Sequence, residues 1–194
     1  MISGAVDRVD EAIINGKKYI RVVDYKSSGK EFALSDVVQG LNMQMFIYLF
    51  TLWQNGKKKY GEFTPAGVLY YPANSPLVSV RRDMSDQDIE NERQKRSRMN
   101  GIILNDYDVI TAMDESKSGL FVPAGFKGGE FSGSLIGLEQ LNRLKEKADE
   151  ILSEMAVALH SGEIPAIPSM AKATKKPANT AIIRRFVRMK KTYP

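Results

Sequence analysis

An Asn-Gly dipeptide between two short runs rich in valine and isoleucine is the sequence feature that most constrains the fold. Asn15-Gly16 favours a tight turn, so the flanking residues 4–10 and 19–28 are predicted to pair as an antiparallel hairpin. Pairing about this turn places Asp7 opposite Asp24. Side chains alternate between the two faces of a strand, so Asp24 and Lys26 point to one face and Tyr25 to the other. The sequence therefore predicts two acids and a lysine at one spot.

These residue types suit a hard cation with a positively charged helper. Mg²⁺ keeps several of its waters and is commonly held by one or two carboxylates. Such an ion lowers the pKa of a bound water and neutralises charge on a phosphoryl oxygen. A lysine beside it can position or deprotonate an attacking water, or stabilise the phosphate. The alternative is a solvated surface hairpin, but the acid on the partner strand and the motif that follows favour the cation site.

That motif lies on an apolar segment predicted to be a helix from near Val37, after a cap at residues 34–36, to about Gln54. Gln44 and Tyr48 are four residues apart and therefore share one face of this helix. The alternative interpretation is a core helix with one buried amide and one buried phenol, each needing a hydrogen-bond partner.

Gly4-x-x-Asp7, then Asp24-Tyr25-Lys26, then Gln44-x-x-x-Tyr48 together resemble the pattern of RecB-family nucleases, a branch of the PD-(D/E)xK superfamily. The similarity is closer still to the C-terminal nuclease domain of the AddB branch. It covers about residues 3–168, including segments at 65–71, 98–104 and 113–114. It implies an α/β fold: a central mixed sheet with both acid-bearing strands inside, flanked by the Gln44 helix and a long helix over residues 138–160.

The resemblance also implies roles for the site residues. Asp7 and Asp24 would hold Mg²⁺ or Mn²⁺ together with the backbone carbonyl of Tyr25, and Lys26 would serve the attacking water. Gln44 and Tyr48 would orient Lys26 or contact DNA.

The turn after the lysine supplies candidate contacts to DNA phosphates at Ser27, Ser28 and Lys30, with a solvated turn as the alternative.

The function implied is a metal-dependent deoxyribonuclease that processes DNA ends in double-strand break repair. The resemblance implies that a full-length relative works with an AddA-like helicase subunit. This sequence has no Gly-x-x-x-x-Gly-Lys-Ser/Thr loop for ATP, so ATP use would come from another polypeptide. Family members carry a helix with a His, and often a Cys, ahead of the Gly-x-x-Asp strand, and this sequence does not include them. The second hypothesis is therefore a catalytically silent fragment that binds DNA or a partner subunit. A stand-alone nuclease of phage or CRISPR-associated type is the third.

Composition and charge limit the number of domains and the ways in which the chain could attract DNA. The chain has 194 residues, 43% of them apolar, and residues 1–171 are predicted to form one domain. The net charge is +5, but residues 172–194 hold eight Lys or Arg and no acid, so residues 1–171 carry −3. A general attraction to DNA would therefore depend on the basic tail.

Cysteine is absent, which excludes disulfides and thiolate metal sites and favours a cytoplasmic protein. No apolar run is long enough for a membrane span. The lone His160 is predicted to end a helix and not to bind a metal.

The tail, residues 172–194, has an unusual composition for this resemblance. AddB-like domains end with clustered cysteines that help to hold a four-iron cluster. If the codons of Pro177, Thr180 and Phe186 end in T, shifting the reading frame from about residue 177 gives a peptide with cysteines and tyrosines at such a spacing. We therefore predict an out-of-frame remnant of the iron–sulfur segment, and no cluster in this chain. A genuine basic tail that contacts DNA is the alternative.

The remaining segments give simpler predictions. Residues 68–71 read as a buried strand and residues 78–80 as an edge strand. A helix capped at Ser85 is predicted to run to about residue 100, and a short helix covers residues 106–114. Residues 115–134, rich in Gly, Ser and Lys, are predicted to be a flexible excursion.

Overall fold

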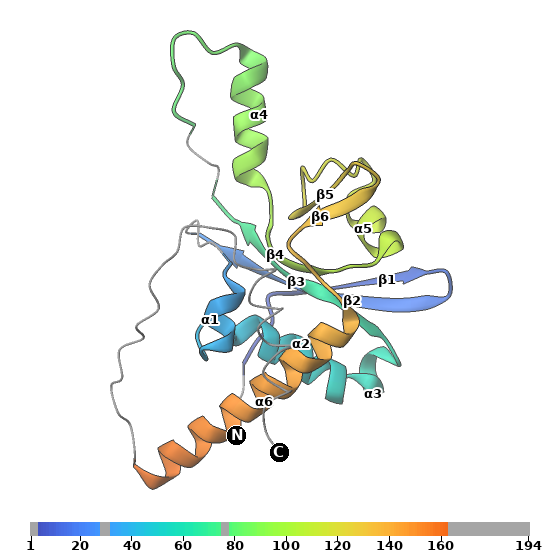
Figure 1. Cartoon of the computed structure of the whole chain (residues 1–194), viewed down its shortest axis with the longest axis vertical. Coiled ribbons are helices and arrows are strands. Elements are labelled where there is room, and N and C mark those ends of the chain that lie inside the picture. The colour runs from blue at the N-terminus through green and yellow to red at the C-terminus, as the bar shows by residue number, and fades with distance from the viewer. Residues whose placement is uncertain (1–3, 28–31, 75–77, 163–194) are drawn as a thin grey trace. The chain divides into compact units, whose positions relative to one another are not determined.

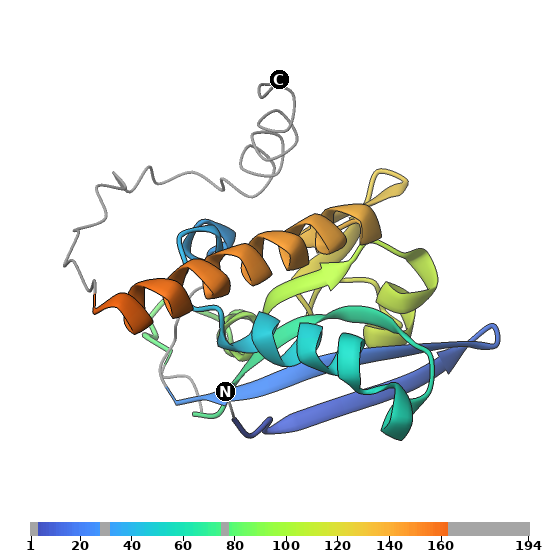
Figure 2. The ribbon, with the colours of Figure 1, turned by 90° about the horizontal axis from the view of Figure 1, so that it is seen from below.

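The predicted hairpin is present as strands β1 (Arg8–Ile14) and β2 (Lys17–Lys26), which pair antiparallel around the turn at Asn15 and Gly16 (Figure 2). The structure is a computed structural model that describes residues 4–27, 32–74 and 78–162. Arg8 pairs with Val23, so the ladder leads on to Asp7 opposite Asp24, as expected. Asn15 has a positive φ of 50° and Gly16 one of 76°, the backbone that an Asn-Gly hairpin turn requires.

The hairpin opens a mixed five-stranded sheet of order β1-β2-β3-β4-β7 (Figure 1). Strand β3 (Thr64–Pro72) is parallel to β2, β4 (Asn100–Leu104) is antiparallel to β3, and β7 (Leu135–Ile136) is parallel to β4. The α/β fold with a mixed central sheet is thereby confirmed. One detail is wrong: β1 lies at the edge of the sheet and not inside it. Ile13 at 70% exposure and charged Glu11 suit an edge better than a buried strand.

Helices cover both faces of the sheet. Helix α2 (Gln44–Asn55) contacts β2 and β3, and α3 (Lys57–Tyr60) follows it directly. Helix α5 (Tyr107–Met113) contacts β4 on the other face. There Val109 and Ile110 pack in one apolar cluster with strand residues such as Val23 and Leu69. Figure 1 shows α2 and α3 on one side of the sheet and α5 on the opposite side.

The segment predicted as one helix from Val37 to Gln54 is two helices. Helix α1 (Leu34–Val38) ends before Gly40, and α2 begins at Gln44. Gly40 and Asn42 have φ values of 79° and 54°, which interrupt helical geometry. The predicted side-chain cap is also wrong, because the N-cap residue is Ala33, which makes no such hydrogen bond.

Two further predictions in the first half of the chain are settled by the structure. Residues 78–80 are not a strand, and Val80 is exposed. Helix α4 (Asp86–Ser97) has the predicted cap, a reciprocal capping box between Ser85 and Asp88. It ends earlier than predicted, and the residues after it form β4, a strand that the sequence pattern did not reveal.

Residues 115–134 are more regular than predicted. They include the antiparallel pair β5 (Ala124–Lys127) and β6 (Glu130–Gly133). The buried carboxylate of Asp114 accepts hydrogen bonds from Ser116 and from the backbone N–H of Gly119, so it orders the turn that leads into this hairpin.

The chain divides into two compact units. The first, residues 1–32 and 44–138, contains the whole sheet; the second contains α1 and nearly all of α6 (Leu138–Ser161).

The bounds predicted for the long helix α6 agree with the structure almost to the residue. Its apolar stripe is buried from Leu141 to Ile151, but Met155 and Leu159 are exposed, so the stripe is not core along its whole length. Within the described ranges, no helix has the length and apolarity needed to cross a bilayer.

Strands β3 and β4 approach each other at two glycines. A Cβ on Gly67 would lie 2.3 Å from the backbone oxygen of Ile102, and one on Gly101 would lie 2.1 Å from the backbone oxygen of Val68. Both glycines have φ near 140°, a backbone region that other residues rarely enter. These two positions fix the register next to the strand end that carries Tyr70 and Tyr71.

We expect Gly67→Ala to lower the free energy of unfolding by about 3 kcal/mol or more, because backbone atoms would have to move. Gly128→Ala is the matched control: its φ is also positive at 66°, but nothing lies within 4 Å of the added Cβ. The control should cost only about 1 kcal/mol. Urea unfolding of both variants measures the difference, and equal losses would contradict the close approach.

Candidate functional site

The C-terminal end of β2 carries a buried ion pair. Asp24 is 6% exposed, and its Oδ2 lies 2.6 Å from Nζ of Lys26. The two residues are separated by one position and so share a face of the strand, as predicted. This contact lacks the geometry of a hydrogen bond, and Oδ2 of Asp24 is buried with no hydrogen-bond partner among the described residues. The charge of the buried carboxylate is therefore compensated by Lys26.

The ring of Tyr70 lies beside this pair. The sequence pattern did not identify Tyr70 as a site residue. It is the register partner of Asp24 on the neighbouring parallel strand, and its ring centroid lies 5.7 Å from Nζ of Lys26. Burial, and then the negative charge of Asp24, raise the pKa of Tyr70 to about 12. The phenol is therefore neutral at physiological pH. Its place in the site depends on the parallel pairing of β3 with β2, which the sequence pattern did not reveal.

Two further aromatic side chains pack in a row with Tyr70. The ring of Phe32 lies 6.2 Å from that of Tyr70 and 6.0 Å from that of Phe46 on α2. This packing joins the sheet to the helix whose first turn carries Gln44.

Asp7 lies just ahead of β1, at the same end of the hairpin. Its Oδ2 accepts a hydrogen bond of 3.1 Å from the backbone N–H of Tyr25. A strand residue directs its N–H and C=O toward the same neighbouring strand, so the Tyr25 carbonyl also faces the side of Asp7. The hairpin thus brings Asp7 to the end of β2 that carries Asp24.

Gln44 and Tyr48 reach the same region from α2. The Gln44 amide donates a 2.9 Å hydrogen bond to the Tyr48 hydroxyl. A Cβ on Gly4 would lie 2.7 Å from that hydroxyl oxygen, so the tyrosine packs directly against the segment that leads to Asp7. The glycine of the Gly-x-x-Asp motif therefore makes room for the tyrosine of the Gln-x-x-x-Tyr motif. Among the described residues neither side chain bonds to Lys26, and their expected action on Lys26 or on DNA stays a prediction.

The predicted phosphate contacts are only partly described. Ser27 is exposed, and its carbonyl accepts a hydrogen bond from Asn74. Ser28 and Lys30 lie outside the described residues. His160 is exposed near the end of α6, where a helix-terminal residue was expected.

The donor set fits a hard divalent cation. Asp7 and Asp24 supply carboxylates and Tyr25 a carbonyl, and Mg²⁺ is commonly held by one or two carboxylates together with waters. Oδ2 of Asp24 already faces a positive charge, the Lys26 ammonium at 2.6 Å, so this buried oxygen accommodates a cationic partner. The described ranges contain no group of three or more His, Cys, Asp or Glu residues arranged to hold a metal.

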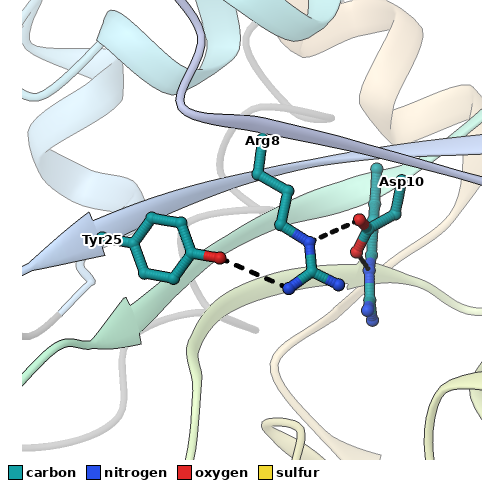
Figure 3. A network of polar contacts seen from close by, with 4 residues as sticks. Arg8, Asp10 and Tyr25 are labelled. Carbon is teal, nitrogen blue, oxygen red and sulfur yellow. Dashed lines mark hydrogen bonds and ion pairs between the residues drawn. The ribbon is translucent and has the colours of Figure 1, made fainter.

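The opposite face of β2 carries a second charged network. Arg8 Nε donates to Oδ1 of Asp10 at 2.6 Å, and Arg21 Nε donates to Oδ2 of the same carboxylate at 2.8 Å. Arg8 also donates to the Tyr25 hydroxyl at 3.3 Å. Figure 3 shows the Arg8 guanidinium lying between Asp10 and the Tyr25 ring. Burial alone would raise the pKa of Asp10, but the hydrogen bonds from the two arginines outweigh it and hold that pKa below its usual value.

The pair of acids with an adjacent lysine, on a mixed five-stranded sheet, agrees with the family that a comparison of the sequence finds. The family model for the PD-(D/E)XK nuclease superfamily matches residues 1–172. The chain belongs to this superfamily.

Several curated relatives share one name, which describes them as a subunit of an ATP-dependent helicase/deoxyribonuclease. The protein of Ruminiclostridium cellulolyticum is 34% identical over 174 residues, or 87% of this chain. That of Clostridium novyi is 35% identical over the same share, and that of Oceanobacillus iheyensis 32% identical over 90% of this chain. The chain spans only 15–16% of the length of these relatives. The resemblance to AddB-type domains is confirmed by these matches.

The Asp10 network predicts an acid-dependent stability. A carboxylate with a depressed pKa stabilises the fold above its unfolded pKa of about 3.9, and this contribution is lost as pH falls through the lower folded pKa. We expect Asp10→Asn to lower unfolding free energy by about 1 kcal/mol at pH 7, a value reduced for partial exposure. Below about pH 4 its deficit should shrink.

Denaturant unfolding between pH 2.5 and 7 measures this effect. Asp83→Asn is the control, because the Arg81–Asp83 pair is 3.8 Å apart and both side chains are 79% exposed. A deficit for Asp10→Asn that stays constant over this pH range would contradict the role assigned to the network.

Proposed function

We propose that this chain is a metal-dependent deoxyribonuclease domain that hydrolyses phosphodiester bonds of DNA. The observation that carries the proposal is the buried Asp24, paired with Lys26 at 2.6 Å at the end of the hairpin to which Asp7 is fixed. Burying a carboxylate is costly, and a cationic partner such as Lys26 or a bound metal ion offsets that cost.

Asp7, Asp24 and the carbonyl of Tyr25 would hold Mg²⁺ or Mn²⁺. When bound, the ion supplies activation of water and neutralisation of phosphoryl charge. Asp7 is held in place by the Tyr25 backbone N–H, so one carboxylate is oriented before a cation arrives. Asp24 is held by its burial and by Lys26.

Lys26 is the group of this chain that would serve the attacking water. Its positively charged ammonium lies 2.6 Å from Oδ2 of Asp24 and 5.7 Å from the centroid of the Tyr70 ring. In that form it orients the water and stabilises the negative charge that develops on the phosphate. Tyr70 acts as a positioning residue: its neutral ring limits where the lysine can lie.

Gln44 and Tyr48 would support the site from α2. Their mutual hydrogen bond and the contact of Tyr48 with Gly4 hold the start of the Asp7 segment in place. Gln44 is exposed, which leaves the rest of its amide free to contact a DNA strand or to orient Lys26 once substrate is bound.

The names of the relatives, which are helicase/deoxyribonuclease subunits, support a role in DNA processing. We infer that the domain trims DNA exonucleolytically at double-strand breaks, alongside a helicase subunit. Ser27, with Ser28 and Lys30, would contact the DNA backbone next to the site.

The nuclease proposal predicts degradation of linear DNA by the purified chain with Mg²⁺ or Mn²⁺. Asp24→Ala and Lys26→Ala should each lower the rate by about 100-fold or more, because each removes a group that acts at the phosphate. Lys57→Ala and Glu62→Ala are matched controls, since this pair has the same 2.6 Å separation but is exposed. Gel assays of DNA length measure the rates. Wild-type rates in either site variant would overturn the proposal.

A second candidate function is a silent domain that binds DNA or a partner subunit without cleaving. The observation that favours it is the absence of any cluster of three or more metal-binding side chains among the described residues. The two candidates differ in metal affinity.

Calorimetric titration with Mn²⁺ or Mg²⁺ separates them. The nuclease proposal predicts saturable binding by the wild type that is lost in Asp24→Ala, because that carboxylate is a ligand. Heats no larger than dilution in the wild type would instead favour the silent domain.

A further inference from the structure

Two tyrosines lie exposed at the end of the sheet that carries the candidate site. Tyr25 is 44% and Tyr71 42% exposed, and their ring centroids are 5.6 Å apart at an interplanar angle of 66°. They are register partners on the parallel strands β2 and β3, so both point to the same face. Two large rings side by side with nearly half of each in solvent form an unusual apolar surface.

The position of this pair relates it to the candidate site. Tyr25 stands between Asp24 and Lys26 in the strand, so its ring leaves the sheet on the face opposite to theirs. Tyr71 stands in the same relation to Tyr70, which lines the Asp24–Lys26 pair. The exposed rings and the ion pair thus lie on opposite faces of the sheet, at the same end of its strands.

A cation accompanies the rings. Arg8 donates to the Tyr25 hydroxyl at 3.3 Å and is itself held by Asp10 at 2.6 Å, while its side chain stays 49% exposed (Figure 3). These hydrogen bonds, that to Asp10 first, raise the pKa of Arg8, so its charge is permanent. The network restricts the Tyr25 ring, and a ring that is already ordered loses little entropy on binding.

Exposed aromatic rings beside a fixed guanidinium are the features with which proteins hold single-stranded nucleic acid. Bases stack on the rings, and the cation attracts the phosphate backbone. A base in a duplex already has both faces covered by its neighbours, so only an unpaired base offers a face to such a surface.

We propose that Tyr25, Tyr71 and Arg8 form a subsite that stacks one unpaired nucleobase of a DNA strand whose backbone passes over the end of β2. This inference rests on the proposed nuclease function and adds a preference for unpaired strands. The subsite holds the strand on one face of the sheet while the Asp24–Lys26 pair meets a nearby phosphodiester on the other.

Binding of fluorescently labelled single-stranded oligonucleotides, followed by anisotropy in EDTA, tests the subsite without catalysis. We expect Tyr71→Leu to raise Kd about fivefold or more, as loss of one stacked base does, and Tyr71→Phe to restore binding because it keeps the ring. Tyr107→Leu is the matched control: Tyr107 is 54% exposed and also makes an edge contact with a neighbouring ring, but lies on α5.

An oligonucleotide of abasic sites provides a test that needs no variant. The wild type should bind it about as weakly as Tyr71→Leu binds the normal strand, and Tyr71→Leu should weaken abasic binding no further. Equal affinity of the wild type for normal and abasic strands would overturn the subsite, as would an equal loss in Tyr107→Leu.

The two proposals fail separately in these measurements. DNA that stays intact with Mg²⁺ and Mn²⁺, while the stacking difference persists in EDTA, would overturn the nuclease proposal alone. Cleavage with no stacking difference would overturn the subsite alone.

Discussion

The cost of burying a carboxylate is the constraint on which the candidate site depends. Asp24 is nearly inaccessible, and in an apolar surrounding such a charge requires a nearby cation. Lys26 supplies it from the next position on the same strand face, which keeps both groups on one rigid element. The Tyr70 ring lies beside the lysine, and Phe32 links it to Phe46 on α2, so the low exposure of Asp24 strengthens the electrostatic interaction within the pair.

Strand alternation gives the same few residues two different surroundings. On one face of β2, Asp24 and Lys26 form a largely buried ion pair. On the other face, the Tyr25 side chain lies in an exposed cluster of aromatic and charged side chains with Arg8, Asp10 and Tyr71. The backbone of Tyr25 belongs to the first of these and its side chain to the second. One residue thus contributes to both, because peptide groups lie in the sheet while side chains leave it.

The parts of the fold that could be predicted were mostly those indicated by short sequence patterns. Asn15-Gly16 determined the hairpin and its register, and therefore the placement of Asp7 opposite Asp24. Helical periodicity found α6 almost to the residue, and the Ser85–Asp88 capping box marked the start of α4. Each of these signals depends on residues close together in the chain.

Features that depend on distant pairing were not visible. The strand β4 follows a highly charged helix directly and is defined by its contact with β3 through Gly67 and Gly101. Tyr70 joins the site only because β3 lies parallel to β2, and the contact of Tyr48 with Gly4 needs α2 to fold back on the hairpin. The edge position of β1 likewise depends on which strands assemble beside it.

The reciprocal glycines of β3 and β4 have a genetic consequence. A side chain added at either position meets main-chain oxygen and not another side chain, so no smaller residue elsewhere can relieve the clash. Suppressor mutations usually act by reshaping a neighbour, and here the neighbour is the peptide backbone that every residue shares. Variants that lose either glycine should therefore revert at the same codon instead of acquiring second-site suppressors.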